Sequence, residues 1–394
     1  MAISDYLNKL VQLKNDLITT LRNKGVEVSD DEKLNTLVPK VEEVERESDF
    51  EIVDMPIDTF AGDSNGGVTG VIRMIKSFNI PENSTIIPSY AFSGYTSLVN
   101  ITIPNSVTNI GYQAFYNCSS LTDITIPNSV TTIRTKAFAG CTSLTNLSIS
   151  DSFTSTEDEY TFSGCNIKNL TFIEGTKNIN NAVTSKIKNT LETVIIPNSV
   201  TSIGYGAFSG CKSLINITIP DNVTSIGSSA FDGCTSLTNI IIPDNVTSIG
   251  SSAFDGCTSL TEINIPNSVT SIELYTFYGC SSLTNITIPS SVTRIRNKAF
   301  QSCSSLTDVI IHDGATSIGD YAFYGCSSLT DIIIPSSVTS IGAAAFYSCG
   351  SLANIYYTGT REQWYSMTIG NNWNAGMGLN VTGGTKIHYN YVPE

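Results

Sequence analysis

Residues 121–143 read LTDITIPNSVTTIRTKAFAGCTS, and this stretch is one full copy of a repeat that runs through most of the chain. Apolar residues at Leu121, Ile124 and Ile126 precede a proline, and an Ala-Phe pair is followed three residues later by a cysteine. The phenylalanine of that pair recurs every 23 residues almost throughout, with one interval of 24 and one of 46. Counting the first apolar residue of each copy from Ile75 onward gives thirteen units.

The spacing of apolar residues in each copy predicts a short strand, because intervals of three and two place alternate side chains on one face. The proline then ends the strand, since it cannot donate a hydrogen bond to a neighbouring strand. One such coil cannot bury its inward side chains alone, so the copies must stack on one another. We therefore predict a leucine-rich repeat solenoid over residues 75–355, with about 13 units, one parallel β-sheet and returns made of loops or short helices.

The full pattern is L-x-x-I-x-I-P-x-x-V-x-x-I-G-x-x-A-F-x-x-C, and it holds from Ile75 to about Tyr357. It resembles the BspA-like leucine-rich repeat family of bacterial and some protozoal surface proteins, and this resemblance implies a solenoid fold and a role as a surface adhesin. The copy within Asp151–Asn189 lacks the I-P block and carries Ser185 where the phenylalanine belongs. We expect a bend or a bulged loop there, with the acidic residues 157–159 in solvent.

All ten cysteines of the chain stand at one phase of the repeat. A residue type that is set by phase indicates a packing position, which a buried thiol can fill. The Cβ vectors of stacked coils run parallel rather than toward one another, which disfavours disulfides, and no C-x-x-C pair suggests a zinc site. We predict a column of buried free thiols, without a metal or a cofactor.

The histidines do not indicate catalysis. His312 and His388 are the only two in the chain, and they lie far apart in the sequence. No group of acid, base and nucleophile can be assembled around them. His312 stands at the proline phase of its copy, so we interpret it as a turn residue and expect no enzyme activity.

The composition narrows the possible partners. Only 14% of the residues are charged and the net charge is −14. Binding to nucleic acid needs clustered Lys and Arg, so that class of partner is disfavoured. No apolar run approaches the roughly 18 to 20 residues that cross a bilayer, and Met1–Leu21 lacks the continuous apolar stretch of a secretion signal. We expect no membrane span.

Residues 1–49 predict a small α-helical module ahead of the repeats. Apolar residues between Ile3 and Leu21 recur at helical spacing and form one stripe. Ser29 and Glu32 then have the spacing of a capping box, which predicts the start of a second helix.

The block from Tyr6 to Val44 resembles a short N-terminal segment of tail proteins of phages that infect Gram-positive bacteria. Residues 50–74 are predicted to be a linker with a strand that leads into the first coil. Two interpretations of the helical module stay open. It either caps the solenoid as a helical hairpin, or it is an assembly or docking module that forms a homo-oligomer through residues 3–44.

Residues 356–394 are predicted to form a C-terminal cap, with a short helix over 361–367 and a last strand over 386–391. Both tryptophans of the chain, Trp364 and Trp373, lie in this segment. They form either a hydrophobic lid over the last coil, which repeat arrays require, or an aromatic platform for a sugar.

The residue between the two inward isoleucines of each predicted strand must face outward, and it is polar in most copies. In three consecutive copies at the C-terminal end it is apolar, and adjacent exposed apolar residues usually mark a contact surface. Either the C-terminal segment folds back over these residues, or they form a partner-binding face with the polar residues two positions earlier. The candidate residues are Asp308, Ile310, Asp331, Ile333, Asn354 and Tyr356, with Trp364 and Trp373 as secondary candidates.

A repeat array without catalytic groups predicts a non-catalytic recognition or adhesion protein. The favoured hypothesis is a phage tail or fibre component that contacts a protein or polysaccharide of a bacterial surface, which would place the chain in the virion tail or outside the cell. One alternative is a bacterial surface adhesin that binds host or neighbouring-cell ligands. The other is a structural spacer that binds no ligand.

Overall fold

The structure is a computed structural model that describes residues 75–151, 160–378 and 384–392. It also describes Ile18, Thr19 and Arg22, and the backbone of β1 (Glu51–Ile52) and β9 (Thr154–Ser155). The predicted helical module and most of the predicted linker lie outside the described residues, as do residues 157–159.

Two compact units make up the chain. Unit 1 comprises Met1–Leu147 and Phe153–Asn166. Unit 2 comprises Ser148–Ser152 and Ile167–Glu394. We describe each unit by itself.

Each regular coil contains one long strand, one short strand and a set of tight turns. In the coil that starts at Leu283, β20 (Asn285–Ile288) alternates exposed and buried side chains, as expected for a strand with one face on the core. Pro289 follows the strand, and β21 (Arg294–Ile295) comes next. The turns after β21 bury Phe300.

Unit 1 stacks these coils in parallel register. The strand β1 lies in the segment predicted as a linker and pairs with the first long strand, with Glu51 opposite Ser77. Two parallel sheets have the orders β1-β2-β4 and β3-β5-β7-β9. The bounds are β2 (Ser77–Asn79), β3 (Ile86–Ile87), β4 (Asn100–Thr102), β5 (Asn109–Ile110), β6 (Asp123–Ile126), β7 (Thr132–Ile133) and β8 (Asn146–Ile149), the last of which ends in unit 2.

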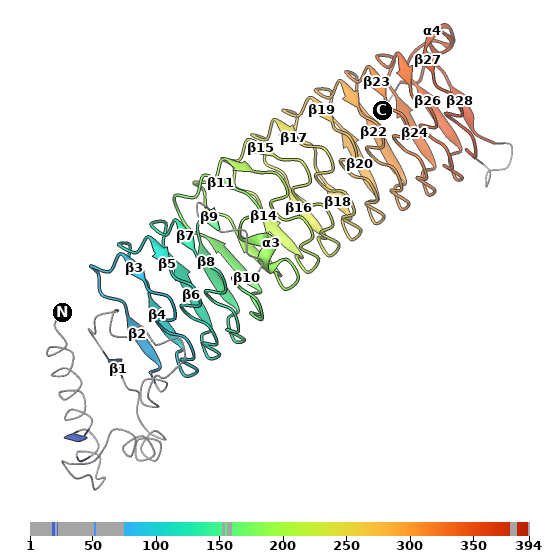
Figure 1. Ribbon diagram of the computed structural model, residues 1–394. Coiled ribbons are helices and arrows are strands. Elements are labelled where there is room, and N and C mark those ends of the chain that lie inside the picture. Colours follow the sequence, from blue (N-terminus) through green and yellow to red (C-terminus); the bar gives the residue numbers. More distant parts are fainter. Residues whose placement is uncertain are drawn as a thin grey trace. The chain divides into compact units, whose positions relative to one another are not determined.

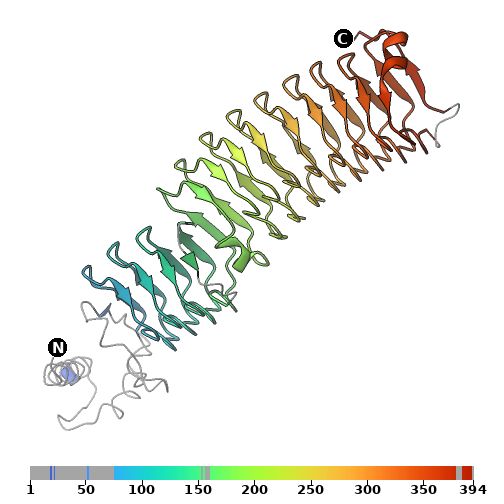
Figure 2. The same cartoon turned by 45° about the horizontal axis from the view of Figure 1, so that its top comes forward.

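Unit 2 repeats the arrangement over more coils, and its strands succeed one another along the stack (Figure 1, Figure 2). The long strands are β10 (Asn169–Phe172), β12 (Thr193–Ile195), β14 (Asn216–Thr218), β16 (Asn239–Ile241), β18 (Glu262–Ile263), β20, β22 (Asp308–Ile311), β24 (Asp331–Ile334), β26 (Asn354–Tyr357) and β28 (Lys386–His388). The short strands are β11 (Asn178–Ile179), β13 (Ser202–Ile203), β15 (Ser225–Ile226), β17 (Ser248–Ile249), β19 (Ser271–Ile272), β21, β23 (Ser317–Ile318), β25 (Ser340–Ile341) and β27 (Thr368–Ile369).

The prediction of one parallel sheet is corrected by these short strands, which form ladders of their own. Their inward residue is an isoleucine and their other residue is polar, as at Ser225 and Ile226. Such a pair suits a half-buried extended backbone, so the return path of the coil is extended as well. The strands themselves, all parallel, confirm the predicted solenoid.

A column of stacked phenylalanine rings runs through the core of each unit. In unit 1 Phe115 stacks on Phe138 with ring centroids 4.9 Å apart. In unit 2 the rings from Phe208 to Phe346 stack at 5.2 to 5.5 Å with interplanar angles of 2° to 14°. Because each ring touches the rings of the coils before and after it, the coils depend on their neighbours for burial.

The cysteines form a second column, as predicted. All ten are free thiols, and all except the half-buried Cys165 are buried. Most of the thiols donate a hydrogen bond to the carbonyl of the phenylalanine of the preceding coil, as Cys257 does to Phe231 at 3.1 Å. Burial raises the pKa of Cys211 to about 12, so these thiols stay protonated and unreactive.

One coil of unit 2, residues 260–282, interrupts both ladders; we call it the junction coil. The short-strand sheets are β11-β13-β15-β17 and β19-β21-β23-β25-β27, and the long-strand ladder likewise ends at β18 and resumes at β20. The N–H of Thr247 donates to the carbonyl of Thr224 at 2.9 Å, whereas the N–H of Thr270, one coil later, makes no such bond to Thr247. Contact between the coils is kept by the turns, where Phe254 N–H donates to the carbonyl of Thr276 at 2.9 Å, and by the core columns.

The departure from the repeat pattern near Ser185 is helical. The short helix α3 (Thr184–Ile187) replaces the turn that carries the phenylalanine elsewhere, whereas the part of the predicted bend or bulged loop at 156–159 lies outside the described residues. Its Thr184 hydroxyl donates to the carbonyl of Ala207 in the next coil. The helix thus occupies the missing place with Thr184 and Ile187, both of which are buried.

The C-terminal segment closes unit 2. The helix α4 (Arg361–Ser366) begins with a capping box in which Thr360 and Gln363 bond each other's backbone N–H, and β28 adds a last strand. Both elements match the sequence prediction. Trp364 is 3% exposed and packs edge-on against Tyr357, at 5.2 Å between ring centroids. Within the described residues, no helix has the length and apolar character to traverse a bilayer.

Candidate functional site

The predicted partner-binding residues lie side by side on the outward face of β22, β24 and β26. Parallel pairing places Ile310 beside Ile333, and Ile333 beside Tyr356. The next strand continues this column with His388. Ile310 is 41% exposed, whereas Ile333 and Tyr356 are half-buried. We call Ile310, Ile333 and Tyr356 the apolar stripe.

The polar candidates form a row beside the apolar stripe. The Asn354 amide donates to Asp331 Oδ1 at 2.7 Å, and the Thr307 hydroxyl donates to Asp308 Oδ2 at 2.7 Å. The ring of His388 lies 2.9 Å from Asn354 Oδ1 through Nε2. Two carboxylates and an amide thus border the apolar residues, and the pairing of Asn354 with Lys386 places a cation at the end of the row. The row can accept hydrogen bonds from a partner.

The tryptophans do not pack on the apolar stripe through their rings. Trp364 contacts Tyr357, which belongs to an inward column, and Trp373 lies edge-on to Phe346 at 6.3 Å. Tyr356 instead stacks on His388 at 4.9 Å and lies 4.6 Å from Tyr391. The C-terminal segment therefore reaches the stripe at Tyr356. The burial of Trp364 makes it part of the cap core, which leaves it no free face for a sugar.

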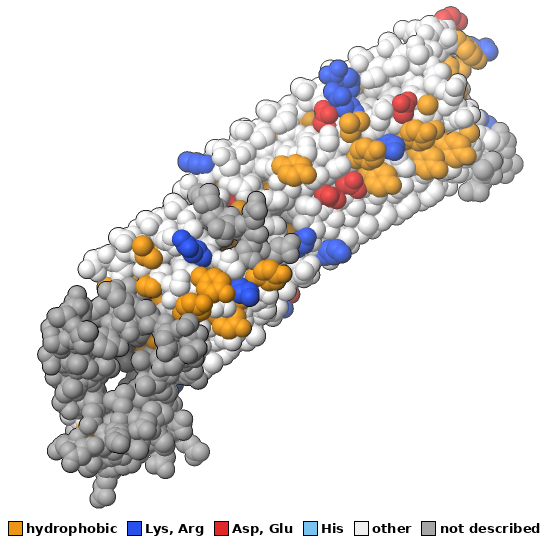
Figure 3. Space-filling model, viewed as in Figure 1, with side chains coloured by type: hydrophobic (Ala, Val, Ile, Leu, Met, Phe, Trp, Pro, Cys, Tyr) orange, Lys and Arg blue, Asp and Glu red, His pale blue; other side chains and the backbone are white. Residues whose placement is uncertain are grey.

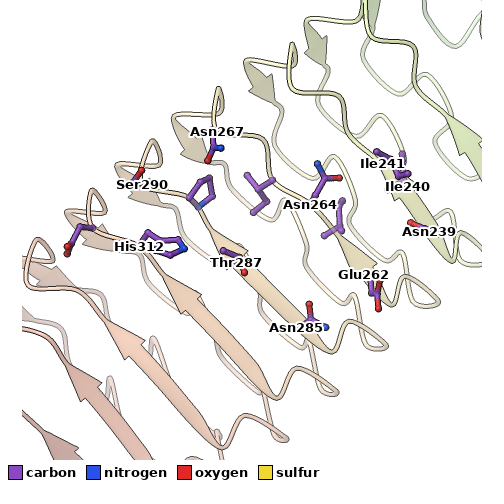
Figure 4. A pocket seen from close by; sticks show the side chains of 14 residues that line it. Asn239, Ile240, Ile241, Glu262, Asn264, Asn267, Asn285, Thr287, Ser290 and His312 are labelled. Atoms are coloured by element: carbon purple, nitrogen blue, oxygen red, sulfur yellow. The ribbon is translucent and has the colours of Figure 1, made fainter. Parts of the chain in front are cut away.

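A groove of about 820 Å³ opens where the long-strand ladder is interrupted. Figure 4 shows the side chains that line it, from β16, β18, β20 and the turn with His312. Six of the fourteen lining residues carry an amide or a hydroxyl, five are apolar, including the exposed Ile241, and the other three are Glu262, His312 and Asp313. The polar side chains of this lining can hydrogen-bond a ligand.

The groove exists because one side chain replaces a backbone group. The N–H of Ile242 donates to Asn264 Oδ1 at 3.0 Å, and the Asn264 amide donates to the carbonyl of Ile242 at 2.8 Å. At the equivalent place in unit 1, the N–H of Ile80 bonds the backbone carbonyl of Thr102 at 3.1 Å. The side-chain amide of Asn264 is longer than a backbone carbonyl, so the chain after Ile263 leaves the ladder.

A third surface, which the sequence analysis did not single out, lies on the turns around the phenylalanines. Five tyrosines and one lysine of four successive coils contact one another there. Figure 3 shows hydrophobic side chains gathered around a basic side chain between the short strands β19–β25 and the long strands β20–β26. We call this group the tyrosine–lysine cluster; its members are Tyr275, Tyr278, Lys298, Tyr321, Tyr324 and Tyr347.

The signal for this cluster is present in the sequence. The turn reads YTFYGC at 275–280 and YAFYGC at 321–326, so tyrosine flanks the phenylalanine on both sides in two copies. Only the stacking of the coils shows that Lys298 and Tyr347 join the same surface. Across the described residues, no three His, Cys, Asp or Glu side chains are placed to hold a metal ion together.

Comparison with known proteins agrees with this architecture. The profile of one protein family, described as "BspA type Leucine rich repeat region (6 copies)", matches residues 72–190, 185–307 and 247–372. The chain belongs to the BspA-type leucine-rich repeat family. Proteins of this type are typically found at the cell surface or outside the cell, and the family indicates a non-catalytic surface or protein-interaction role.

Solved structures include other leucine-rich repeat proteins. A leucine-rich repeat protein from Bacteroides ovatus is 29% identical, with a TM-score of 0.53, over 79% of this chain and 91% of that one. A leucine-rich cell surface protein from Faecalibacterium prausnitzii is 29% identical, with a TM-score of 0.32, over 74% of this chain and 90% of that one. Among curated proteins, none shows significant sequence similarity to this BspA-type chain.

Proposed function

We propose that this BspA-type protein is a non-catalytic recognition protein that contacts a protein or polysaccharide of a bacterial surface through the outward face of β22, β24 and β26. The observation that carries the proposal is the apolar stripe, where Ile310, Ile333 and Tyr356 are adjacent by strand pairing. Along most of the array the same outward position holds threonine, serine or asparagine. A run of apolar side chains on a polar surface, bordered by hydrogen-bond acceptors, has the composition of a contact surface.

The proposal is tested by binding of the labelled, purified protein to a panel of bacterial cells and cell-wall polysaccharides, with Ile333→Asp as the variant. Thr218→Asp is the matched control, because Thr218 is exposed at the same position of β14, away from the stripe. We expect Ile333→Asp to weaken binding about tenfold or more, as for a central interface residue. The melting temperature should stay that of the parent protein. Reduced stability with full binding would show that the stripe is part of the cap.

A more specific version of this proposal is that the chain is part of the tail or fibre of a phage-like particle. Its support is the resemblance of Tyr6–Val44 to tail proteins, which lies in the part of the chain that the structure does not describe. Family membership supports the alternative of a bacterial surface adhesin. Antibody labelling of purified particles and of cell envelopes from the source organism separates the two locations. A structural spacer, the third possibility, predicts no binding to any cell envelope.

A further inference from the structure

The tyrosine–lysine cluster is continuous through contacts of its own. Lys298 Nζ lies 5.1 Å from the ring centroid of Tyr275 and 5.7 Å from that of Tyr321. Tyr321 lies 5.8 Å from Tyr324, and Tyr324 stacks on Tyr347 at 5.3 Å with an interplanar angle of 7°. Stacking covers one face of each ring and leaves the ring edges and hydroxyls to a ligand. Ring edges carry the positive part of the aromatic quadrupole, which attracts anions.

The backbone of the cluster shows that these side chains are not needed for the turn. Tyr275, Lys298 and Tyr321 have φ values of 58°, 61° and 57°, a left-handed conformation that is uncommon for large side chains. The same phase is occupied by Gly206 at φ 60° and by Ser252 at φ 55°. Small residues make this turn equally well, so tyrosine and lysine stand there for what their side chains do.

The cluster contains Lys298, one of the few cations in this part of the chain. Between residues 213 and 360 the only Lys and Arg residues are Arg294, Arg296 and Lys298, although the chain carries a net charge of −14. Arg296 pairs with Glu273 at 3.0 Å. The Tyr275 hydroxyl raises the pKa of the Lys298 ammonium through a hydrogen bond, which keeps this group charged. A cation held among phenol groups on an otherwise acidic array is complementary to an anion.

Unit 1 contains a second arrangement of the same kind. Lys136 stands at the phase of Lys298, also in the left-handed conformation, and lies 5.8 Å from the ring centroid of Tyr160 in the next coil. Both lysines belong to the pattern R-x-K-A-F, at 134–138 and at 296–300. In unit 1, Tyr90 and Tyr112 approach each other at 5.4 Å on the neighbouring turns. The combination of lysine and tyrosine thus recurs at the same turn phase in both units.

We propose that the tyrosine–lysine cluster binds an anionic glycopolymer, a chain of sugars or polyols that carries carboxylate or phosphate groups. The ammonium and the phenol hydroxyls bind the anions, and the ring edges contact the carbon skeleton. An extended polymer can follow the cluster over the four coils that contribute to it. Nucleic acid also carries a phosphate backbone, so DNA is one of the comparison polymers in the test. This inference rests on the proposed recognition of a bacterial surface and names the chemistry of the partner.

Calorimetric titration of the full-length protein tests the proposal. The probes are poly(glycerol phosphate) teichoic acid, alginate oligosaccharides, neutral dextran, polyglutamate and DNA. Phosphate-bearing and carboxylate-bearing glycopolymers are thus compared with an uncharged polysaccharide and with polyanions of other classes. The variants are Lys298→Ser and Tyr321→Ser, since serine occupies this turn phase naturally at Ser229 and Ser252. The matched controls are Lys212→Ser, which removes one exposed charge, and Tyr205→Ser, which removes a tyrosine that is 72% exposed outside the cluster.

We expect one or both anionic polymers to bind the parent protein, more weakly at higher salt, and dextran not to bind. The two cluster variants should lose about tenfold or more in affinity, while the controls and Ile333→Asp stay within about twofold. An equal loss of affinity for Lys212→Ser would show that the effect comes from net charge alone and would overturn the proposal. Equal binding of dextran, polyglutamate or DNA would overturn it as well. If no polymer binds while whole cells still do, the cluster has been misassigned but the recognition function stands; if cells do not bind either, the recognition function fails.

Discussion

Replacement of Phe254 by alanine tests the part of unit 2 where the short-strand ladder is interrupted. Phe254 is fully buried, and its ring stacks on Phe231 at 5.3 Å and on Phe277 at 5.5 Å. Phe277 belongs to the junction coil, whose short strand β19 does not pair with β17. The core columns and the turn bonds therefore hold these two coils together on that side.

The expected cost follows from what the alanine removes. Truncation of a buried phenylalanine costs about 3 to 5 kcal/mol, because the transfer free energy is lost and a cavity remains. Two ring contacts are lost together, which puts the variant toward the upper end of that range. Phe323→Ala is the matched control, since its ring stacks at 5.2 and 5.3 Å but its coil pairs with both neighbours in both ladders. The two variants remove the same side chain from different hydrogen-bonding contexts.

Thermal and denaturant unfolding followed by circular dichroism measures the difference. In a repeat array each interface contributes separately, so a weakened junction should uncouple the coils before it from the coils after it. We expect Phe254→Ala to broaden the transition or split it in two, and Phe323→Ala to lower the midpoint without a split. If Phe254→Ala shifts the melting temperature no more than the half-buried Ser251→Ala does, the phenylalanine column is not the core.

Three further predictions concern other parts of the chain. Burial raises the pKa of Asp151 to about 7, and an unfolded aspartate titrates near 4, so the free energy of unfolding should decrease as the pH rises from about 4 to about 7. In denaturant titrations Asp151→Asn should reduce this pH dependence, and an unchanged dependence would contradict the assignment. At pH 8 the native thiols should react slowly with an alkylating reagent, because the pKa values of Cys211 and Cys349 are raised to about 12. The unfolded, unreduced chain should show ten reactive thiols, and a count well below ten would indicate disulfides. Removal of residues 1–49 should change the number of chains per particle in light scattering and leave the circular dichroism of the solenoid intact; equal masses for both forms would argue against an assembly module.

The sequence predicts the core of this protein well, because the core is periodic. Leu121, Ile124 and Phe138 recur at fixed phases, and each phase becomes one buried column once the coils stack. The cysteine column follows for the same reason. The sequence does not indicate that the short strands form a second ladder, because two residues with one inward isoleucine are too few to show an alternation. Only the pairing of Ser225 with Ser202 and Ser248 reveals them.

The outward positions are harder to predict, because their meaning depends on neighbours that lie about 23 residues away in the chain. The apolar stripe could be predicted, since it needs only the alternation of inward and outward residues along each strand. The tyrosine–lysine cluster could not be found in that way, because its residues stand in turns and touch across coils. The groove at Asn264 is the hardest of the three to predict from the sequence, because it depends on a side chain that forms hydrogen bonds in place of the backbone.

Both candidate surfaces of unit 2 lie in the coils from the junction onward, and the strand ladders suggest a physical reason. The apolar stripe begins at β22, and the tyrosine–lysine cluster begins at Tyr275 in the junction coil itself. From β19 and β20 to the last strands, β27 and β28, the ladders run without interruption, so the side chains of these coils are held in one register. A ligand that contacts several coils at once loses less affinity to ordering when those coils are already fixed relative to one another. Both surfaces therefore rest on coils whose ladders are continuous. Disruption of these ladders should weaken contacts that extend over several coils more than contacts within a single coil.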